Sequence, residues 1–529
     1  IRRPRMKRAM FGLAAVLIAS GAEAAPPANF DQRVEQLRTA MGVPGVSISI
    51  VEDGRPTLAR GWGVRQVGTS DAVGADTIFA TGSTGKAFTV AALAVLVDQG
   101  KLGWDDKVID YMPDFRMYDP WVTREMTVRD LLVHRSGLGL GAGDLLFIPN
   151  SDLSRKETVR RLRYIKPATS FRSGFAYDNV LYMVAGQLIE EVSGQSWEQF
   201  VRANIFQSLG MSHSTDTDAE LQANPDRARP HSRSGGAIVG LGKQTALDES
   251  AAISANAAPA GGLAISANDM TKWLLTQLGH GRIPGSDKRL FSDAASVEMW
   301  APVTLEPIDA LPAEFAATQP NFNAYALGWD VSDYRGVKII SHGGAVFGSL
   351  AMVVLIPDRN IGFFIAVNSE EGQLVRGLTD ELLDHYLGLP AAAWPEKFDV
   401  YKRKRQAAAA AMVSAQAAKP ARIGPSLALD RYVGDYTDAW YGTIKVRRAG
   451  NGLAIEYPHS RGLSGRLTHH QYDTFRTNPT LHFVEPAYVT FSLDADGKVD
   501  RVTMMPVSPL ADFSFDYQDL LFTPAKADK

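Results

Sequence analysis

The stretch ATGSTGKAFTV, residues 80–90, decides how the rest of the chain is interpreted. It holds glycines, hydroxyl groups and a lysine, as a phosphate-binding P-loop does. That motif requires a glycine five residues before Gly85 and a hydroxyl directly after the lysine. Those two positions hold Ala80 and Ala87. The P-loop is therefore excluded, and what remains is Ser83 three residues before Lys86.

Ser83 and Lys86 stand at the head of a segment, residues 84–99, that is apolar on nearly every side and predicts a buried helix. Residues three apart share a helix face, so the two side chains are expected to lie together. Burial disfavours an ammonium and lowers the pKa of a lysine, which would place a base beside a weak nucleophile. The alternative is a serine that caps the helix and a lysine that reaches solvent, which is the commoner meaning of S-x-x-K alone.

Two later segments carry residues that could act together with a serine nucleophile and a lysine base. Tyr177 and Asn179 stand directly before an apolar helix predicted over residues 179–193, where the phenol could relay a proton or simply pack. His342 and two glycines, Gly343 and Gly344, follow at the end of a strand predicted over 337–342. Glycines let a substrate backbone lie close to a strand edge. Each of these segments alone is weak, since a strand-end histidine is more often a turn residue.

Taken together and in this order, S-x-x-K, Y-x-N and H-G-G resemble the serine β-lactamase and D-alanyl-D-alanine carboxypeptidase family. The tyrosine in the second motif is typical of the branch of class C β-lactamases, bacterial esterases and D-aminopeptidases. The segments IFATGSTGKAFT, LLVHRSGL, YDNVLYMVAGQLIEEVSG and PAGGLAISANDMTKW resemble that family over about residues 30–388. The tail, with YVGDYTDAWYGTIKV and LTHHQYDTF, resembles the lipocalin-like domain fused to some peptidases of this branch.

The resemblance implies roles for particular residues. Ser83 would be the acylating nucleophile, with Lys86 and Tyr177 as its base pair. The backbone amides of Ser83 and Ala345 would form the oxyanion hole. Asn179 would hold a substrate amide or position the lysine. The other residues expected to bind substrate or form the oxyanion hole are His342, Gly343, Gly344 and Ala345. Where β-lactamases usually carry a lysine cation in the third motif, this chain has His342, which favours peptidase or esterase activity.

The resemblance and the element pattern together predict an α+β fold, with an antiparallel β-lactamase/transpeptidase-like sheet, helices on both of its faces and a helical lobe. A hairpin is expected over 44–66, a short helix over 126–138, strands over 349–356 and 362–368, and a helix over 371–387. The expected parts are a hydrolase domain over 30–388, an alanine-rich linker over 389–427 and a small antiparallel β-barrel over 428–529. The barrel is expected to shape substrate access without supplying catalytic groups.

Composition and targeting signals limit the function further. A basic start at Met6, an apolar run and the A-x-A site at 22–24 predict a signal peptide over residues 1–24, with the residues before Met6 an artefact. The mature protein is then expected in the periplasm or secreted, without a membrane span. A net charge of -3 argues against a nucleic-acid partner. The absence of cysteine excludes disulfides and thiol catalysis. No metal or cofactor is expected, because His469 and His470 suit an exposed strand pair.

The sequence therefore predicts an exported serine peptidase or amidase that acts on short peptides, including D- or unusual residues. A narrower hypothesis is a peptidase that cleaves linearised microcystin. The alternatives are a carboxylesterase, a weak β-lactamase, or a non-enzymatic penicillin-binding sensor that becomes acylated and stays so. The expected partners are a small molecule or short peptide, and a homo-oligomer is also compatible with the sequence.

Overall fold

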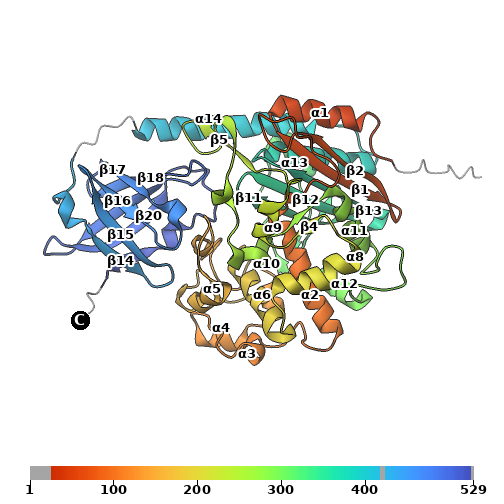
Figure 1. Ribbon diagram of the computed structural model, residues 1–529, viewed down its shortest axis with the longest axis horizontal. Helices are drawn as coiled ribbons and strands as arrows, with labels where there is room; N and C mark the ends of the chain where they lie inside the picture. Colours follow the sequence, from red (N-terminus) through yellow and green to blue (C-terminus); the bar gives the residue numbers. More distant parts are fainter. Residues whose placement is uncertain (1–24, 418–422, 526–529) are drawn as a thin grey trace, which may run out of the picture.

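A computed structural model describes residues 25–417 and 423–525 of the 529-residue chain. The predicted signal peptide lies outside these residues. Two parts are seen in Figure 1: a larger one built on a broad sheet and a cluster of helices, and a smaller barrel, in blue at the left. This confirms the predicted fold class, since the sheet is antiparallel and the barrel is closed.

The main sheet has eight strands in the order β2-β1-β13-β12-β11-β10-β9-β8. Its strands are β1 (Gly45–Glu52), β2 (Arg55–Gly63), β8 (Thr304–Leu305), β9 (Asn323–Tyr325), β10 (Asp330–Tyr334), β11 (Val337–Val346), β12 (Ser349–Ile356) and β13 (Ile361–Val367). Strand β13, IGFFIAV, is apolar and buried at every residue, as expected of a central strand covered on both faces. Asp53 and Gly54, both at positive φ, form the tight turn of the predicted β1–β2 hairpin.

Helices cover both faces of this sheet. On one face lie α1 (Phe30–Met41) and α13 (Gly372–Tyr386), whose buried Val34, Leu378 and Leu382 share a hydrophobic cluster with Ile365 of β13. The other face is covered by α11 (Ala267–Leu278), which contacts β1, β2 and β13. The side chain of Ser266 caps α11 by accepting a hydrogen bond from the amide of Asp269.

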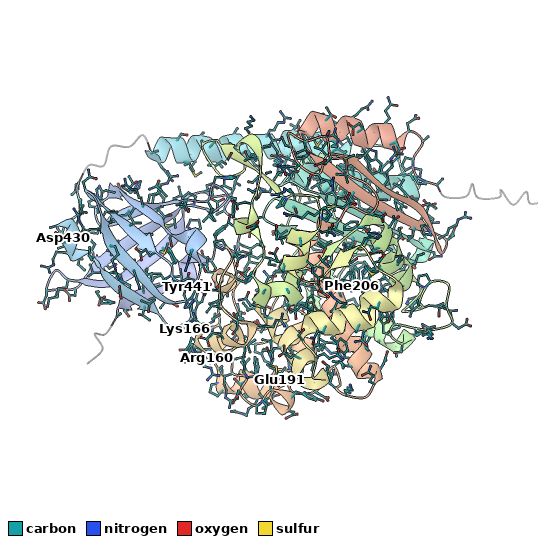
Figure 2. The ribbon with its side chains drawn as sticks, in the orientation of Figure 1. Arg160, Lys166, Glu191, Phe206, Asp430 and Tyr441 are labelled. Carbon is teal, nitrogen blue, oxygen red and sulfur yellow. The ribbon has the colours of Figure 1, made fainter. Side chains whose placement is uncertain are left out.

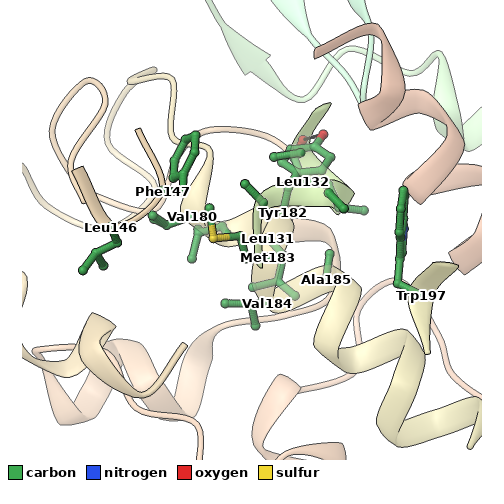
Figure 3. Close-up of a cluster of buried hydrophobic side chains, with 14 of the residues drawn as sticks. Leu131, Leu132, Leu146, Phe147, Val180, Tyr182, Met183, Val184, Ala185 and Trp197 are labelled. Atoms are coloured by element: carbon green, nitrogen blue, oxygen red, sulfur yellow. Dashed lines mark hydrogen bonds between the residues drawn. The ribbon is translucent and has the colours of Figure 1, made fainter. Parts of the chain in front are cut away.

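The helical lobe is centred on two buried helices, α2 (Lys86–Asp98) and α6 (Val180–Ser193). Figure 3 shows Val180, Met183 and Val184 of α6 among the side chains of the buried cluster that includes Leu131 and Phe147. Helix α6 ends at Gly194, whose φ of 74° suits a residue without a Cβ. The lobe's other helices are α3 (Val108–Tyr111), α4 (Pro120–Glu125), α5 (Arg155–Arg161), α7 (Trp197–Val201), α8 (Gln207–Leu209), α9 (Asp218–Ala223), α10 (Ala258–Gly261) and α12 (Asp293–Met299).

Two local expectations are wrong. Residues 126–138 form a single 3₁₀ turn, Arg129–Leu131, instead of a helix. Asp130 accepts hydrogen bonds from the amide and hydroxyl of Thr127, and His134 has a φ of 53°, so the chain leaves the helical conformation before Gly137. Strand β11 does not end at His342 but continues to Val346, because Gly343 and Gly344 pair with Met352 and Ala351 of β12.

The two parts are joined by α14 (Trp394–Ala417), a helix of 24 residues. Its length is about 36 Å, at 1.5 Å per residue. It packs on α13 and runs along the top of the molecule in Figure 1 toward the barrel. Residues 418–422 of the predicted linker lie outside the described residues. Gln416 accepts a hydrogen bond from the hydroxyl of the barrel's Tyr488 at 3.2 Å, so the helix ends against the barrel.

The barrel closes in the order β14 to β21. Its strands are β14 (Gly434–Asp438), β15 (Gly442–Ala449), β16 (Gly452–Glu456), β17 (Gly465–Gln471), β18 (Thr474–Pro479), β19 (Ala487–Leu493), β20 (Val499–Pro506) and β21 (Leu521–Pro524). Alternate residues point inward, and Tyr432, Phe475 and Phe491 pack edge to face inside. No helix among the described residues has the length and hydrophobicity needed to cross a membrane.

The barrel is seated on the helical lobe through polar contacts. Arg161 of α5 donates to the carbonyl oxygen of Tyr441, and the ring of His459 lies 2.8 Å from a carboxylate oxygen of Asp152. Figure 2 labels Tyr441 on the side of the barrel that faces the lobe, and Arg160 and Lys166 on the lobe. These contacts hold the barrel against the helical lobe.

Candidate active site

Ser83 lies in a short 3₁₀ turn, Gly82–Gly85, that leads directly into α2. The turn is placed by β3 (Phe79–Ala80), which pairs with β7 (Ala264–Ile265). Its other residues are buried, whereas Ser83 is partly exposed. The exposed face belongs to a cavity of about 770 Å³, so the hydroxyl of Ser83 is available to a bound molecule.

Lys86 is completely buried and its amine is held by three neighbours. Its Nζ lies 2.9 Å from the Oγ of Ser83, 2.7 Å from the Oδ1 of Asn179 and 2.9 Å from the carbonyl oxygen of Ala260. Burial lowers the pKa of Lys86 to about 7, although the charges of Asp144 and Asp178 oppose the shift. A substantial fraction of Lys86 is therefore neutral near neutral pH.

The neighbours of Lys86 decide where its lone pair points. The amide oxygen of Asn179 and the carbonyl oxygen of Ala260 can only accept hydrogen bonds. A neutral amine has two N–H groups, which these two acceptors use. The remaining lone pair then faces Ser83, whose hydroxyl donates to it. An amine with its lone pair toward a hydroxyl can act as a general base on that hydroxyl.

Tyr177 lies on the other side of the same hydroxyl. Its ring is 4.8 Å from the Nζ of Lys86, and its phenol interacts with the side chain of Ser83 by a hydrogen bond. The ring also lies 4.1 Å from that of buried His134, whose Nδ1 accepts from the amide of Asp178. Burial raises the pKa of Tyr177 well above its usual range, so the phenol stays protonated and can pass a proton without becoming a phenolate.

Asn179 positions Lys86 and is itself held in turn. Its Oδ1 accepts from Lys86, and its Nδ2 donates to the Oδ2 of Asp144 at 2.8 Å. Asp144 is completely buried, and burial raises the pKa of its carboxyl to about 8. Of the two roles considered for Asn179, positioning the lysine is the one that its contacts serve. Asp144 was not expected from the motifs, although it is the lone charged residue of the segment 137–149.

The third motif lies in the middle of β11, opposite Ser83. His342 is 3% exposed, and its Nδ1 lies 2.6 Å from the carbonyl oxygen of Gly343. Its Nε2 lies 2.7 Å from the hydroxyl of Tyr325. A carbonyl only accepts, so the ring carries its proton on Nδ1 and accepts from Tyr325. Burial and the nearby Lys86 lower the pKa of His342 to about 3, which leaves the ring neutral at neutral pH.

Glycines let the Ser83 turn and β11 approach closely enough to bring two backbone amides together. A Cβ on Gly82 would lie 2.6 Å from the amide nitrogen of Ala345, and one on Gly344 would lie 3.1 Å from that of Ser83. A Cβ on Gly344 would also collide with the carbonyl oxygen of Thr81. Ser83 and Ala345, whose amides are predicted to form the oxyanion hole, thus line the same cavity.

The cavity wall also includes residues from the barrel that the motifs did not indicate. They come from the segments around 483–485 and 510–515 and include Phe483, Glu485, Asp512, Phe513, Ser514 and Phe515. With Phe147 and Phe347, the aromatic residues make much of the wall apolar. Glu485, Asp512 and Glu370 add carboxylates. Within the described residues no cluster of three or more His, Cys, Asp or Glu side chains could hold a metal ion.

These features define a serine hydrolase site, and comparison with known proteins gives its family. The chain belongs to the Beta-lactamase family, whose family model matches residues 30–387. Residues 418–524 match a second family, described as a domain of unknown function, DUF3471. The lipocalin-like character expected of the tail stays a prediction.

Individual relatives are distant but cover most of the chain. Unguisins hydrolase ungD of Aspergillus violaceofuscus is 27% identical over 469 residues, which cover 79% of this chain and 76% of the relative. Penicillin-binding protein 4 of Amycolatopsis lactamdurans is 28% identical over 383 residues, covering 70% of this chain and 92% of the relative.

Among solved structures, the octameric penicillin-binding protein homologue from Pyrococcus abyssi superimposes with a TM-score of 0.57 at 20% identity. The superposition covers 93% of this chain and 99% of that one. At this identity the likeness shows a shared fold that includes both parts of the chain.

Proposed function

We propose that this protein is a serine peptidase or amidase that cleaves short peptides through an acyl-enzyme on Ser83. The observation that carries the proposal is the pair of Ser83 and Lys86, 2.9 Å apart, with a buried lysine whose two acceptor neighbours leave its lone pair for the serine. The word hydrolase in the name of the fungal relative agrees with this reaction class.

Acylation follows from the positions of these groups. The Oγ of Ser83 attacks the carbonyl carbon of the substrate while its proton passes to the Nζ of Lys86. The negative charge that develops on the carbonyl oxygen is stabilised by the amides of Ser83 and Ala345. The bond from the carbonyl carbon to the leaving nitrogen then breaks, and Tyr177 passes a proton from Lys86 to that nitrogen. The products of this half-reaction are an amine and an ester on Ser83.

Deacylation uses the same groups in reverse. A water molecule enters the place of the leaving amine and gives a proton, through Tyr177, to the neutral Lys86. Its oxygen attacks the ester carbon, the bond to the Oγ of Ser83 breaks, and Lys86 returns the proton to the serine. The neutral phenol of Tyr177 suits this exchange in both directions because it holds one proton throughout.

The cavity supports a peptide as the substrate class. Its volume of about 770 Å³ is at the upper part of the usual range of small-molecule sites and suits a few residues of extended chain. The aromatic side chains of Phe147, Phe483 and Phe513 would accept bulky apolar groups. Peptides with D- or unusual residues, including a linearised cyclic peptide such as microcystin, are the narrower form of this proposal.

A carboxylesterase would use the same acyl-enzyme, and a penicillin-binding sensor would stop at it. The test is a panel of L- and D-peptides, p-nitrophenyl esters and a chromogenic cephalosporin, with the acylated state followed by mass spectrometry. Faster turnover of peptides than of matched esters, relative to their uncatalysed rates, supports the amidase. An acyl-enzyme that accumulates on Ser83 without turnover with every compound would contradict it.

Export to the periplasm or beyond, after removal of residues 1–24, is proposed with this function on the basis of the sequence. A homo-oligomer is also proposed, and the octamer named for the Pyrococcus abyssi homologue is a reason to measure the assembly state.

The rate of hydrolysis should rise as the pH passes through about 7, because Lys86 accepts a proton only when neutral and burial lowers its pKa to about 7. The measurement is kcat/KM on a peptide across the pH range, with circular dichroism as a check that the fold is unchanged. An acid limb in the range of an ordinary carboxylic acid would show that another group is the base.

His342→Lys should raise the turnover of a cephalosporin roughly tenfold over a very low wild-type rate, because the wild-type ring is neutral and offers the substrate carboxylate no cation. His342→Gln is the matched control, since it keeps a hydrogen-bonding group without a charge. A wild-type protein that hydrolyses the cephalosporin faster than any peptide would contradict this reading of the third motif.

A further inference from the structure

The loop over residues 507–516, which follows β20 of the barrel, reaches into the site of the other part of the chain. Leu510 and the run from Asp512 to Phe515 line the cavity that contains Ser83. The ring of Phe513 lies 5.9 Å from that of Tyr177, edge to face. This loop, referred to below as the 507–516 loop, is therefore part of the wall beside the reacting groups.

Buried contacts lock the 507–516 loop against the chain around Asp144. The completely buried carboxylate of Asp516 accepts from the amides of Gly143 at 2.8 Å and Leu145 at 3.2 Å. At Gly141 a Cβ would lie 2.7 Å from the carbonyl oxygen of Phe513, so the two backbones are in close contact. These contacts fix the position of the loop against the lobe.

A continuous series of hydrogen bonds runs from this loop to the base. The hydroxyl of Ser514 donates to the Oδ2 of Asp144 at 2.7 Å, and the same oxygen accepts from the Nδ2 of Asn179 at 2.8 Å. Asn179 then accepts from Lys86 at 2.7 Å. The other oxygen of Asp144, Oδ1, has no hydrogen-bond partner among the described residues. Ser514 and Asn179 are thus the two side chains that fix this carboxylate.

We propose that Ser514 is a positioning residue for catalysis. Through Asp144 and Asn179 it orients Lys86, so that a side chain of the barrel helps to hold the general base of the catalytic part in place. The inference rests on the proposed function, because it assigns Lys86 the role of base. It goes beyond that function in making one residue of the barrel, Ser514, a component of the reaction machinery.

The charge on Asp144 gives the proposal a second consequence. Hydrogen bonds from Ser514 and Asn179 favour the ionised form of the Asp144 carboxyl group. Burial has the opposite and larger effect, and it raises the pKa of Asp144 to about 8. An ionised Asp144 in turn favours the ammonium form of Lys86. The other groups that face this pair are Asp178, Asp512, Asp516, His134, His342, Tyr177 and Tyr182. None of them is changed by a substitution at Ser514.

The test is Ser514→Ala in the full-length protein, with the rate of fluorophosphonate labelling of Ser83 and the kcat and KM of a hydrolysed substrate measured across the pH range. We expect roughly a tenfold fall in labelling rate and in kcat, with KM little changed. The acid limb should move to lower pH, because a less ionised Asp144 leaves Lys86 with a lower pKa. A merely structural defect would lower the rate without moving the limb.

Two further variants complete the experiment. Ser508→Ala is the matched control, since that buried hydroxyl accepts only from the amide of Leu510 in its own loop, and it should behave as the wild type. Asp144→Asn can keep both accepted hydrogen bonds on its single oxygen while it loses the charge, so its acid limb should also move to lower pH. It remains informative if Ser514→Ala does not fold.

The outcomes separate the inference from the proposed function. A wild type that is not labelled at Ser83 contradicts the proposed function itself. If the wild type is labelled but a folded Ser514→Ala has the same rate and the same acid limb, the positioning role is wrong. An Asp144→Asn variant with an unmoved acid limb, or a Ser508→Ala variant as impaired as Ser514→Ala, overturns it as well.

Discussion

Ser83→Ala is expected to abolish covalent labelling by a fluorophosphonate and to lower kcat by about 10⁶-fold, the range found when the nucleophile of a serine protease is removed. The physical reason is that the hydroxyl of Ser83 faces the cavity and contacts the amine of Lys86 at 2.9 Å. The measurement is intact-protein mass spectrometry with peptide mapping, together with the hydrolysis rate of the best substrate of the panel.

A suitable control for this variant is Ser173→Ala. The hydroxyl of Ser173 is exposed and donates only to the carbonyl oxygen of Ser170, so its loss should leave labelling and turnover unchanged. If the probe still adds its mass to Ser83→Ala, or maps to a peptide without residue 83, another residue is the nucleophile and the assignment fails.

Lys86→Ala is expected to lower kcat by about 10²–10⁴-fold, the usual contribution of a general base, while Ser83 remains in place. The substitution leaves a space bordered by the Oδ1 of Asn179 and the carbonyl oxygen of Ala260. Methylamine could enter this space with its N–H groups on those two acceptors and its lone pair toward Ser83. Added methylamine should therefore restore part of the rate, more strongly at pH values where the amine is neutral.

The control for the lysine is Lys272→Ala. That lysine is partly exposed and pairs with Asp269, and neither residue lines the cavity, so neither the rate nor a response to methylamine should change. Turnover of Lys86→Ala at the wild-type rate would remove Lys86 from the mechanism. If the fold is retained and methylamine does not restore the rate, the amine acts only when the lysine side chain holds it in position.

The parts of this fold that the sequence predicts well are those governed by local rules. The β1–β2 hairpin has a turn of Asp53 and Gly54 directly after a mostly apolar strand, and α6 has an apolar run followed by a glycine. The pair of Ser83 and Lys86 is also local, since their contact follows from three-residue spacing at a helix start.

Where local patterns failed, distant residues had decided the outcome. The segment 126–138 has a helical pattern, yet its Asp130 is held by Arg172, and the chain turns at His134, whose Nδ1 accepts a hydrogen bond from the amide of Asp178. Strand β11 continues past His342 because β12 supplies partners for its two glycines. Neither effect is visible in the segment itself.

The same distinction applies to the site. Ser83, Lys86, Tyr177 and Asn179 could be proposed because each belongs to a short motif. Asp144 had only a weak signal, a single carboxylate in an apolar segment. Ser514 had none, because its role depends on how the barrel is seated on the lobe. That arrangement is set by contacts such as those of Asp516 with Gly143 and Leu145, between residues more than 300 positions apart.

The position of the barrel against the helical lobe also has a consequence for the biosynthesis of this protein. Domains generally fold as units, beginning with the part that is synthesised first. The part that carries Ser83 can assemble its sheet before the barrel exists, but the cavity wall from Asp512 to Phe515 is translated more than 400 residues after the nucleophile. A nascent or prematurely terminated chain thus has an open, one-sided site. Only a chain that has been translated past Phe515 can have the complete cavity wall.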